Sequence, residues 1–384
     1  MSWIKVYILI GKTHPNCKMK IAIIGSRGYP YVYSGYETFV QQLSERLVKK
    51  KVSVTIYCHK SLFKKKPTQV NGINLKYVSG IQTKSLSQLT HSFLSILSAC
   101  FDNFDVIFVV NAANGPLGVI TKLFNKKTVI NVDGLEWLRP KWKGLGAVYY
   151  KFAARMATIF YDQIINDAEE MRKIYLDLFR KDSKVIAYGP KDDFEKSSNI
   201  FEKIKVKKLD YFLIVGRLIP DNNWDILVKG FKLSKSSKKL VIVGDNPFKN
   251  DFKDNLILDN SDNIIFTGLI EDQSELCDLF KNAYAYLHGH EYGGTNPTLI
   301  EALSFGNAVL ALDTVFNQEV LQNDNYGLYF NKNKESVRDL IDYADSNREE
   351  ILILKSKSNV ALKKKYEWDY IIDQYLEVFE ELCN

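Results

Sequence analysis

The sequence predicts an α/β protein with two doubly wound, parallel-sheet domains that face each other across a cleft. Short apolar runs alternate with amphipathic helical patterns along almost the whole chain, which is typical of parallel sheets covered on both faces. The chain has 384 residues, which favours two domains over one. Ligands bind such sheets at the carboxyl ends of the strands, so both binding edges are expected at the cleft.

The first domain is predicted over residues 19–189, with a C-terminal helix at 366–384 packing back onto it. An amphipathic helix is expected at residues 37–50, between the first two strands. Nearly continuous apolar runs predict buried strands at residues 20–25, 52–57, 106–110, 128–132, 163–165 and 184–187.

A polar stretch at residues 190–209 is predicted to be the linker. The second domain is then expected over residues 210–365. Its strands are predicted at residues 211–215, 240–243, 263–267, 283–287 and 308–312, and its helices at 224–233, 272–281 and 297–305. The first 18 residues precede a second methionine, Met19, and are interpreted as an extension.

Composition excludes several classes of protein. Hydrophobic residues make up 46% and charged residues 25%, so the chain is neither disordered nor collagenous. No apolar stretch reaches the roughly 18 residues that cross a bilayer. The five cysteines are scattered and form no C-x-x-C pair, which argues against a disulfide framework or a zinc site and favours a reducing cytoplasm.

Charge is distributed unevenly along the chain. Residues 1–189 hold 28 Lys and Arg against 12 Asp and Glu, a net charge of +16, whereas the remainder holds 24 against 33, a net charge of −9. A basic half attracts a polyanion such as an anionic membrane surface or a phosphorylated substrate. Nucleic acid is not expected, because no zinc-finger spacing, RNA-recognition signature or Arg-rich helix is present.

Residues 288–301, His-Gly-His-Glu-Tyr-Gly-Gly-Thr-Asn-Pro-Thr-Leu-Ile-Glu, are the most informative segment. They follow an apolar strand and open a helix, because Asn296 is a good N-cap and Pro297 suits the first helical position. The small residues at 293–295 would let the backbone approach a ligand, and amides of the first helical turn would bind phosphate. Glu301 would accept hydrogen bonds from a ribose. A tight turn with ordinary capping is the alternative.

Three further segments follow predicted strands. Arg217 would grip phosphate oxygens at the end of its strand, or form a surface ion pair. Gly-Ser-Arg-Gly at 25–28 is half of a dinucleotide fingerprint, and Ser-Gly-Tyr-Glu at 34–37 offers a second anion site.

The segment 131–142 gathers two carboxylates, two cationic side chains and two tryptophans. They could accept a proton, hold sugar hydroxyls and stack on sugar rings, or form a salt-bridged loop. His288 and His290 are interpreted as structural, and no D-x-D triplet for a metal is present.

Taken together, these segments resemble the GT-B glycosyltransferases of family 4, and within it the rhamnosyltransferase-like branch of capsule and rhamnose-polysaccharide synthesis. The resemblance covers almost the whole chain from Met19. It depends on Gly-Ser-Arg-Gly-Tyr-Pro at 25–30, Ser-Gly-Tyr-Glu-Thr-Phe at 34–39, Asn-Val-Asp-Gly-Leu-Glu-Trp at 131–137, Val-Gly-Arg-Leu at 215–218, Pro-Asp-Asn-Asn at 220–223, and Gly-Gly-Thr-Asn-Pro at 293–297 with Glu301.

The resemblance implies a sugar nucleotide held mainly by the second Rossmann-like domain, an acceptor held by the first, and retained anomeric configuration without a metal or other cofactor. The expected donor-binding residues are Gly28, Gly35, Arg217, Asn222, Leu269, Ile270, Gly293, Gly294, Thr295, Asn296 and Glu301. The expected acceptor-binding residues are Glu37, Trp137, Arg139, Lys141 and Trp142. The residues expected to act in catalysis are Asp133, Glu136 and Arg217.

The sequence departs from the broad family at three positions. Gly293 stands where many members carry a first glutamate before Glu301, Asn222 replaces a phosphate-binding lysine, and Asp133 replaces a histidine near the reacting sugar. The named branch shares these changes, which favours a specialised donor.

We therefore expect transfer of a hexosyl unit, L-rhamnose from a deoxythymidine-diphosphate donor, to a sugar on an undecaprenyl-diphosphate carrier. The protein would be cytoplasmic and peripheral to the inner face of the cell membrane. One alternative is a nicotinamide-dependent oxidoreductase, which the absence of an acidic residue in Tyr-Cys-His at 57–59 disfavours. Another is a non-catalytic nucleotide-sugar-binding protein.

Overall fold

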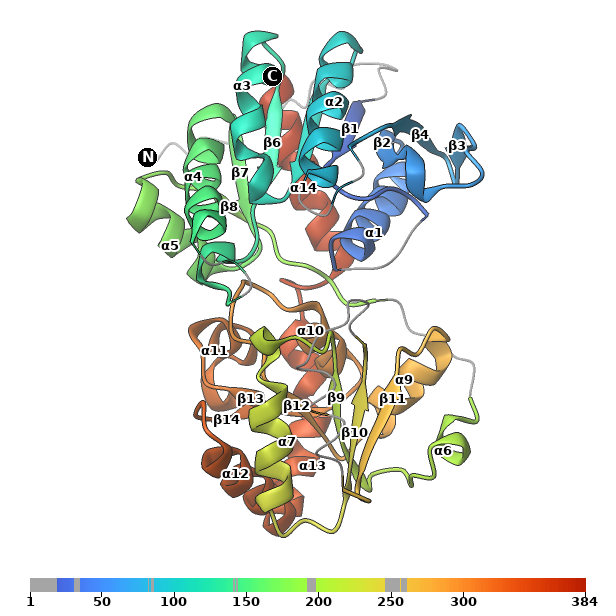
Figure 1. The fold of residues 1–384 in the computed structure, drawn as a ribbon, viewed down its shortest axis with the longest axis vertical. Helices are drawn as coiled ribbons and strands as arrows, with labels where there is room; N and C mark the ends of the chain where they lie inside the picture. Colours follow the sequence, from blue (N-terminus) through green and yellow to red (C-terminus); the bar gives the residue numbers. More distant parts are fainter. Residues whose placement is uncertain are drawn as a thin grey trace, which may run out of the picture.

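The computed structural model describes residues 19–30, 35–81, 83, 86–140, 142, 144–191, 198–245, 256 and 261–384. The expected extension at residues 1–18 and the expected acceptor residue Lys141 lie outside these ranges. The described chain forms two α/β lobes, one above the other in Figure 1. None of the helices in the described ranges is both long and apolar enough to cross a bilayer.

The first lobe is built on an eight-stranded sheet with the order β3-β4-β2-β1-β5-β6-β7-β8. Every neighbouring pair is parallel except β3 and β4, which form an antiparallel edge hairpin. This hairpin was not predicted from the sequence. The strands are β1 (Lys20–Ile24), β2 (Ser53–His59), β3 (Gln69–Val70), β4 (Ile73–Val78), β5 (Val106–Val110), β6 (Thr128–Asn131), β7 (Gln163–Asn166) and β8 (Lys184–Val185).

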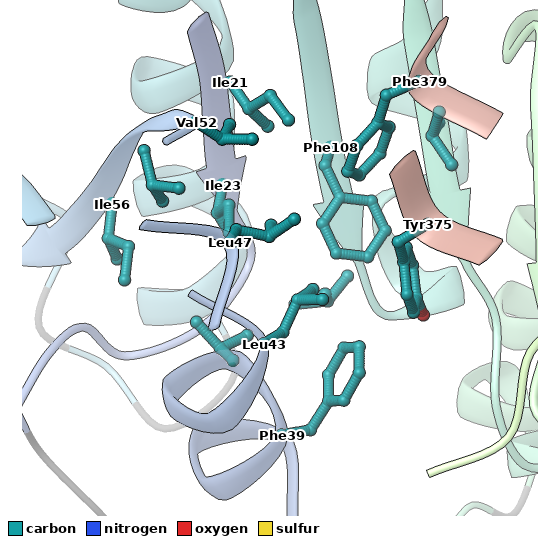
Figure 2. Close-up of a cluster of buried hydrophobic side chains, with 14 of the residues drawn as sticks. Ile21, Ile23, Phe39, Leu43, Leu47, Val52, Ile56, Phe108, Tyr375 and Phe379 are labelled. Atoms are coloured by element: carbon teal, nitrogen blue, oxygen red, sulfur yellow. The ribbon is translucent and has the colours of Figure 1, made fainter. Parts of the chain in front are cut away.

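Helices cover both faces of this sheet. One face packs against α1 (Gly35–Lys49) and the C-terminal helix α14 (Trp368–Cys383). Figure 2 shows Phe39, Leu43 and Leu47 of α1 meeting Phe108 of β5 and Tyr375 of α14. The opposite face packs against α2 (Ser87–Phe101), α4 (Leu145–Phe160) and α5 (Glu169–Phe179), and the short α3 (Gly118–Leu123) lies between α2 and α4.

The second lobe is built on a fully parallel six-stranded sheet with the order β11-β10-β9-β12-β13-β14. Its strands are β9 (Tyr211–Val215), β10 (Lys239–Val243), β11 (Ile264–Gly268), β12 (Ala285–His288), β13 (Ala308–Leu312) and β14 (Gly327–Phe330). One face packs against α7 (Trp224–Leu233), α12 (Lys334–Ser346) and α13 (Arg348–Lys357). The other packs against α9 (Gln273–Asn282) and α10 (Pro297–Ser304), while α11 (Val315–Leu321) faces the first lobe. The predicted fold class is confirmed.

The stretch between the lobes contains more structure than a linker. Residues Ile200–Lys203 form the short helix α6, and Ile200 is buried with the second core. This apolar contact was not predicted, because charged side chains dominate the stretch around Ile200. At the crossing point, Trp368 of α14 donates a hydrogen bond to the Pro190 carbonyl at 2.7 Å. This contact ties the C-terminal helix to the start of the linker.

Candidate active site

A cavity of about 470 Å³ lies between the two lobes. Its walls come from the segments that follow β1, β6 and β7 in the first lobe and β9 and β12 in the second. These are carboxyl ends of parallel strands, where ligand sites of open α/β sheets form. The cavity is therefore the candidate active site.

Arg217 stands at this cavity directly after β9. Gly216 has φ +155°. The main-chain carbonyl of Arg217 accepts hydrogen bonds from Asn222 Nδ2 and Trp224 Nε1, both at 2.8 Å. The two bonds hold the backbone that presents this exposed guanidinium. Asn222 thus positions Arg217, in addition to lining the cavity itself.

The loop before α10 forms another part of the wall. Gly293, Gly294, Thr295 and Asn296 all line the cavity. Gly293 has φ +121°, which favours glycine, and a Cβ on Gly294 would lie 1.8 Å from Asp167 Oδ1. The backbone conformation therefore favours glycine at 293, and the close approach of the two lobes requires it at 294.

The amides of this loop are less available than the sequence analysis expected. Asn296 Oδ1 caps α10 by accepting from the Thr298 N–H at 3.0 Å. The Thr295 N–H donates to Asp167 Oδ2 at 2.9 Å. The helix dipole still favours negative charge at this end, but a phosphate here would compete with these two oxygen acceptors.

Other hydrogen bonds between described residues also cross the interface between the lobes. The Thr295 hydroxyl donates to the Asp167 carbonyl at 2.7 Å. Arg139 Nη2 donates to the Tyr292 carbonyl at 3.2 Å. Glu319 of α11 accepts from the first two amides of α5, Glu169 at 2.8 Å and Glu170 at 2.9 Å. These contacts fix the acceptor-side wall against the loop that precedes α10.

Asp133 is held by two tyrosines. The Tyr36 hydroxyl donates to Asp133 Oδ1, and the Tyr188 hydroxyl donates to Asp133 Oδ2 at 3.2 Å. Burial and the nearby Glu136 raise the pKa of Asp133, although the hydrogen bonds from these tyrosines act against that rise. A carboxyl group with a raised pKa suits exchange of a proton or a hydrogen bond with a sugar hydroxyl.

The Glu136 carboxylate contacts two side chains of its own loop. Its Oε1 lies 2.9 Å from Arg139 Nη1, and its Oε2 accepts from Trp142 Nε1 at 2.7 Å. The Trp142 ring stacks at a tilt on Tyr150, with 4.8 Å between centroids. Glu136, Arg139 and Tyr150 all line the cavity. The expected salt-bridged loop and the expected acceptor wall are thus the same segment.

Glu37, expected at the acceptor, also lines the cavity. It is 4% exposed, its Oε1 accepts from the Arg27 N–H at 3.1 Å, and its Oε2 lies 3.5 Å from Arg27 Nη1. Glu37 therefore stabilises the turn after β1 through Arg27, which itself lines the cavity.

His288 and His290 both line the cavity, although the sequence analysis assigned them structural roles. Burial lowers the pKa of His288 to about 3, and burial together with Arg139 lowers that of His290 well below its ordinary value. Both imidazoles are therefore neutral near pH 7. His290 Nδ1 lies 2.9 Å from Asn222 Oδ1. Among the described residues, no group of three or more His, Cys, Asp or Glu is placed to hold a metal ion.

Two of the expected phosphate-binding glycines do not line this cavity. Gly28 is packed against β2, since a Cβ there would lie 2.8 Å from that of Cys58. Gly35 begins α1. Gly25 and Arg27, from the turn after β1, line the cavity in their place.

Three expected residues of the second lobe are likewise not among the residues that line the cavity. Leu269 and Ile270 line a separate hollow beside α6 and α9. Glu301 is 4% exposed, and its carboxylate lies 3.3 Å from Lys191 Nζ. Burial raises the pKa of Glu301. Glu301 lies one helical turn after Thr298, which lines the cavity, but its carboxylate is buried beside Lys191.

Trp137 packs inside the first lobe. Its ring centroid lies 6.4 Å from that of Tyr175 and 6.3 Å from that of Phe179. Trp142 instead contacts Tyr150 and Glu136 at the cavity wall. The two tryptophans could not be told apart from the sequence, because the short helical turn at residues 136–138 sends them in different directions.

Asp167, Tyr36 and Tyr188 line the cavity but were not predicted from the sequence. Asp167 directly follows β7, so the rule that placed Arg217 at a strand end could have identified it. Burial and the charge of Asp133 raise the pKa of Asp167 well above its ordinary value. Tyr36 and Tyr188 carry no comparable signal, since tyrosine is common in buried positions.

Family comparison identifies the second lobe. Residues 195–359 match the family model of "Glycosyl transferases group 1". The protein is a glycosyltransferase. Residues 18–191 of this glycosyltransferase match a family described as a domain of unknown function (DUF1972). An uncharacterized glycosyltransferase of Methanocaldococcus jannaschii, MJ1069, is 24% identical over 301 residues, which cover 73% of this chain and 76% of that protein.

Solved structures share the architecture of the glycosyltransferase at low identity. Sucrose-phosphate synthase (tll1590) from Thermosynechococcus elongatus superposes with a TM-score of 0.78 and 14% identity over 95% of this chain and 99% of that one. Anabaena Alr3699/HepE in complex with UDP and glucose superposes with a TM-score of 0.74 and 15% identity over 94% and 100% of the chains. The fold is the GT-B fold.

Proposed function

We propose that this glycosyltransferase moves a hexosyl unit from a nucleoside-diphosphate sugar to a saccharide acceptor within the cavity between the lobes. The observation that carries the proposal is the composition of that cavity. Arg217 and the loop 293–296 of the group 1 glycosyltransferase domain face Asp133 and Glu136 of the first lobe. One wall therefore offers positive potential for a diphosphate, and the other offers carboxylates for sugar hydroxyls.

The leaving diphosphate gains negative charge as the glycosidic bond breaks. In the proposed reaction, Arg217 and the positive end of α10 stabilise this charge, as preorganised donors do in an oxyanion hole. The neutral imidazoles of His288 and His290 add no charge but can donate hydrogen bonds. Contacts between the lobes, such as that of Arg139 with Tyr292, would exclude water and suppress hydrolysis of the donor.

Asp133 is proposed to hold the reacting sugars. On the retaining route that the family resemblance implies, it orients a hydroxyl through its tyrosine-held carboxyl group. If Asp133 instead removed the acceptor proton as a general base during a direct displacement, the anomeric configuration would invert. NMR of the product anomer distinguishes the two roles.

The finer proposal names L-rhamnose from a deoxythymidine-diphosphate donor and a saccharide on an undecaprenyl-diphosphate carrier, at the cytoplasmic face of the membrane and without a metal. Its support is the motif resemblance together with the net charge of +16 over residues 1–189. A basic first lobe suits an acceptor that carries a diphosphate and sits among anionic lipids.

The experiment incubates the purified protein with several sugar nucleotides and a lipid-linked acceptor, with and without EDTA, and measures product mass. We expect a hexosyl or deoxyhexosyl increment that EDTA leaves intact and that Arg217→Ala abolishes. Nucleotide-sugar binding without any product would indicate a non-catalytic protein. Reduction of a nicotinamide cofactor would indicate the oxidoreductase.

A further inference from the structure

The outer face of α4 is apolar and exposed. Leu145, Val148, Phe152 and Ile159 are 88%, 66%, 50% and 47% exposed, respectively. Their spacing places them on one side of the helix. The opposite side, with Ala153, Ala154 and Ala157, is buried in the first lobe. The helix therefore differs from an ordinary amphipathic surface helix, because large apolar side chains lie on its solvent side while small alanines lie on its buried side.

The apolar surface continues onto the neighbouring helices. Leu123 of α3 and Phe101 of α2 are 80% and 74% exposed. The rings of Phe101 and Phe124 lie 5.1 Å apart, which joins the ends of α2 and α3. Lys122 Nζ of α3 donates to the Ile159 carbonyl of α4 at 3.4 Å. In Figure 1 the three helices lie side by side on one face of the sheet.

Single exposed apolar side chains are ordinary on a protein surface, but a connected group of them marks an interaction site. We name this group the docking face. It consists of Phe101, Val119, Leu123, Phe124, Leu145, Val148, Phe152 and Ile159.

Positive charges accompany the docking face, and the acidic side chain of Asp102, which adjoins it after α2, is paired with Lys76 at 2.5 Å. Lys151 and Arg155 are exposed on the same side of α4, and Lys122, Lys126 and Lys127 belong to α3 and the turn after it. Residues 106–132 and 144–161 contain no Asp or Glu. Apolar side chains interleaved with Lys and Arg are the surface that an anionic lipid interface recognises. A second copy of the chain is disfavoured, because it would bring two sets of like charges together.

We propose that the docking face binds an anionic lipid surface and anchors the first lobe there. The proposal deepens the proposed function, because a lipid-linked acceptor would reach the cavity from that surface. Tyr150 of α4 lines the cavity, and Trp142, which contacts it, precedes the helix. Docking along α4 would thus bring the acceptor wall close to the lipid headgroups.

The test uses the full chain and vesicles of phosphatidylcholine with 30% phosphatidylglycerol, without donor or acceptor. We expect the protein to cosediment with these vesicles. Its affinity should be at least tenfold weaker for pure phosphatidylcholine vesicles or in 0.5 M salt. The triple variant Leu145→Ser/Val148→Ser/Phe152→Ser and the charge variant Lys151→Glu/Arg155→Glu should each weaken binding at least tenfold.

A matched control removes three exposed apolar side chains from the acidic second lobe, in Leu233→Ser/Leu352→Ser/Ile353→Ser. These side chains are 47%, 43% and 50% exposed, and their loss should leave vesicle binding unchanged. Circular dichroism and nucleotide binding check that each variant folds. The proposal is overturned if the wild type does not bind the vesicles, or if both α4 variants bind them as tightly as the wild type.

A concentration-dependent dimer that the triple variant abolishes, without vesicle binding, would assign the docking face to a second copy of the chain and would also overturn it. Because no reaction is measured, failure here leaves the proposed glycosyl transfer standing. Conversely, vesicle binding by a protein that transfers no sugar would reject the proposed function alone.

Discussion

Asp167 and Thr295 join the two lobes at the cavity through two hydrogen bonds. The Thr295 N–H donates to the Asp167 carboxylate at 2.9 Å, and the Thr295 hydroxyl donates to the Asp167 carbonyl at 2.7 Å. The residues are 1% and 3% exposed. Both partners are thus withdrawn from water, and separating the lobes would leave them to be solvated again.

Thr295→Val is expected to loosen this junction. The variant keeps the side-chain volume but removes the donor to a buried carbonyl, which costs about 1 to 3 kcal/mol. We expect a larger radius of gyration by small-angle X-ray scattering and about a tenfold lower kcat/KM. The control is Thr90→Val, which removes a hydroxyl that donates to the Leu86 carbonyl at 2.7 Å and accepts from the Ile81 N–H at 2.9 Å, all within the first lobe. Equal compactness of Thr295→Val and wild type would contradict this role.

Asp167→Asn is expected to change how stability depends on pH. Burial and the charge of Asp133 raise the pKa of Asp167 well above its ordinary value. The folded protein therefore holds this proton when the unfolded chain has lost it. Asp167 thus lowers stability as pH rises from its ordinary pKa to its folded pKa, by up to about 1.4 kcal/mol per pH unit. The neutral amide has no such dependence.

Thermal unfolding of both proteins between pH 4 and 8 checks this expectation. The melting temperature of Asp167→Asn relative to wild type should rise with pH across that window. A difference that is constant or falls with pH would show that the Asp167 carboxyl group is ionised throughout.

Arg217 is expected to bind the donor diphosphate. Arg217→Ala should weaken nucleotide-sugar binding by roughly 10- to 100-fold, because a charge-assisted hydrogen bond contributes about 1.5 to 3 kcal/mol. Arg217→Lys should recover only part of this affinity, since lysine cannot bind two oxygens in a planar fork. Isothermal titration calorimetry measures both. Wild-type affinity in the alanine variant would remove Arg217 from the donor site.

The pair of Lys191 and Glu301 is expected to stabilise the protein. Lys191→Met would leave a carboxylate that is 4% exposed without its cation at 3.3 Å. The expected loss is about 1 to 3 kcal/mol in urea unfolding, and Glu301→Gln in that background should recover much of it. Titration of both variants with donor tests the ribose role. If Glu301 binds the ribose, Glu301→Gln should weaken donor binding more than Lys191→Met does. Additive losses would show that the pair is not coupled.

The two tryptophans of the acceptor loop are expected to behave differently. Trp137→Ala should destabilise the first lobe by about 3 kcal/mol, since its ring packs beside Tyr175 and Phe179. Its activity per folded molecule should stay close to wild type. Trp142→Ala should instead raise the KM for the acceptor, because it removes one hydrogen-bond donor to Glu136 and uncovers Tyr150. Chemical denaturation and acceptor titration separate the two effects, and the opposite pattern would assign Trp137 to the acceptor.

Local patterns predicted the elements well where strand and helix periodicity were strong. The predicted and observed bounds agree for β9, α7 and β13, because each is an unbroken apolar or amphipathic run between polar or small residues. The hairpin of β3 and β4 and the helix α6 were missed. These are short elements whose apolar contacts come from distant parts of the chain.

The two doubly wound domains, the turn at residues 293–297 and the strand-end position of Arg217 follow from the sequence, since each depends on neighbours along the chain. Which side chains meet at the cavity depends instead on how the lobes fold and pack. Asp167 and Thr295 are 128 positions apart, Lys191 pairs with Glu301 across 110 positions, and sheet order brings Asp133 to Tyr188. Contacts of this kind depend on how two finished sheets pack, which no local periodicity encodes.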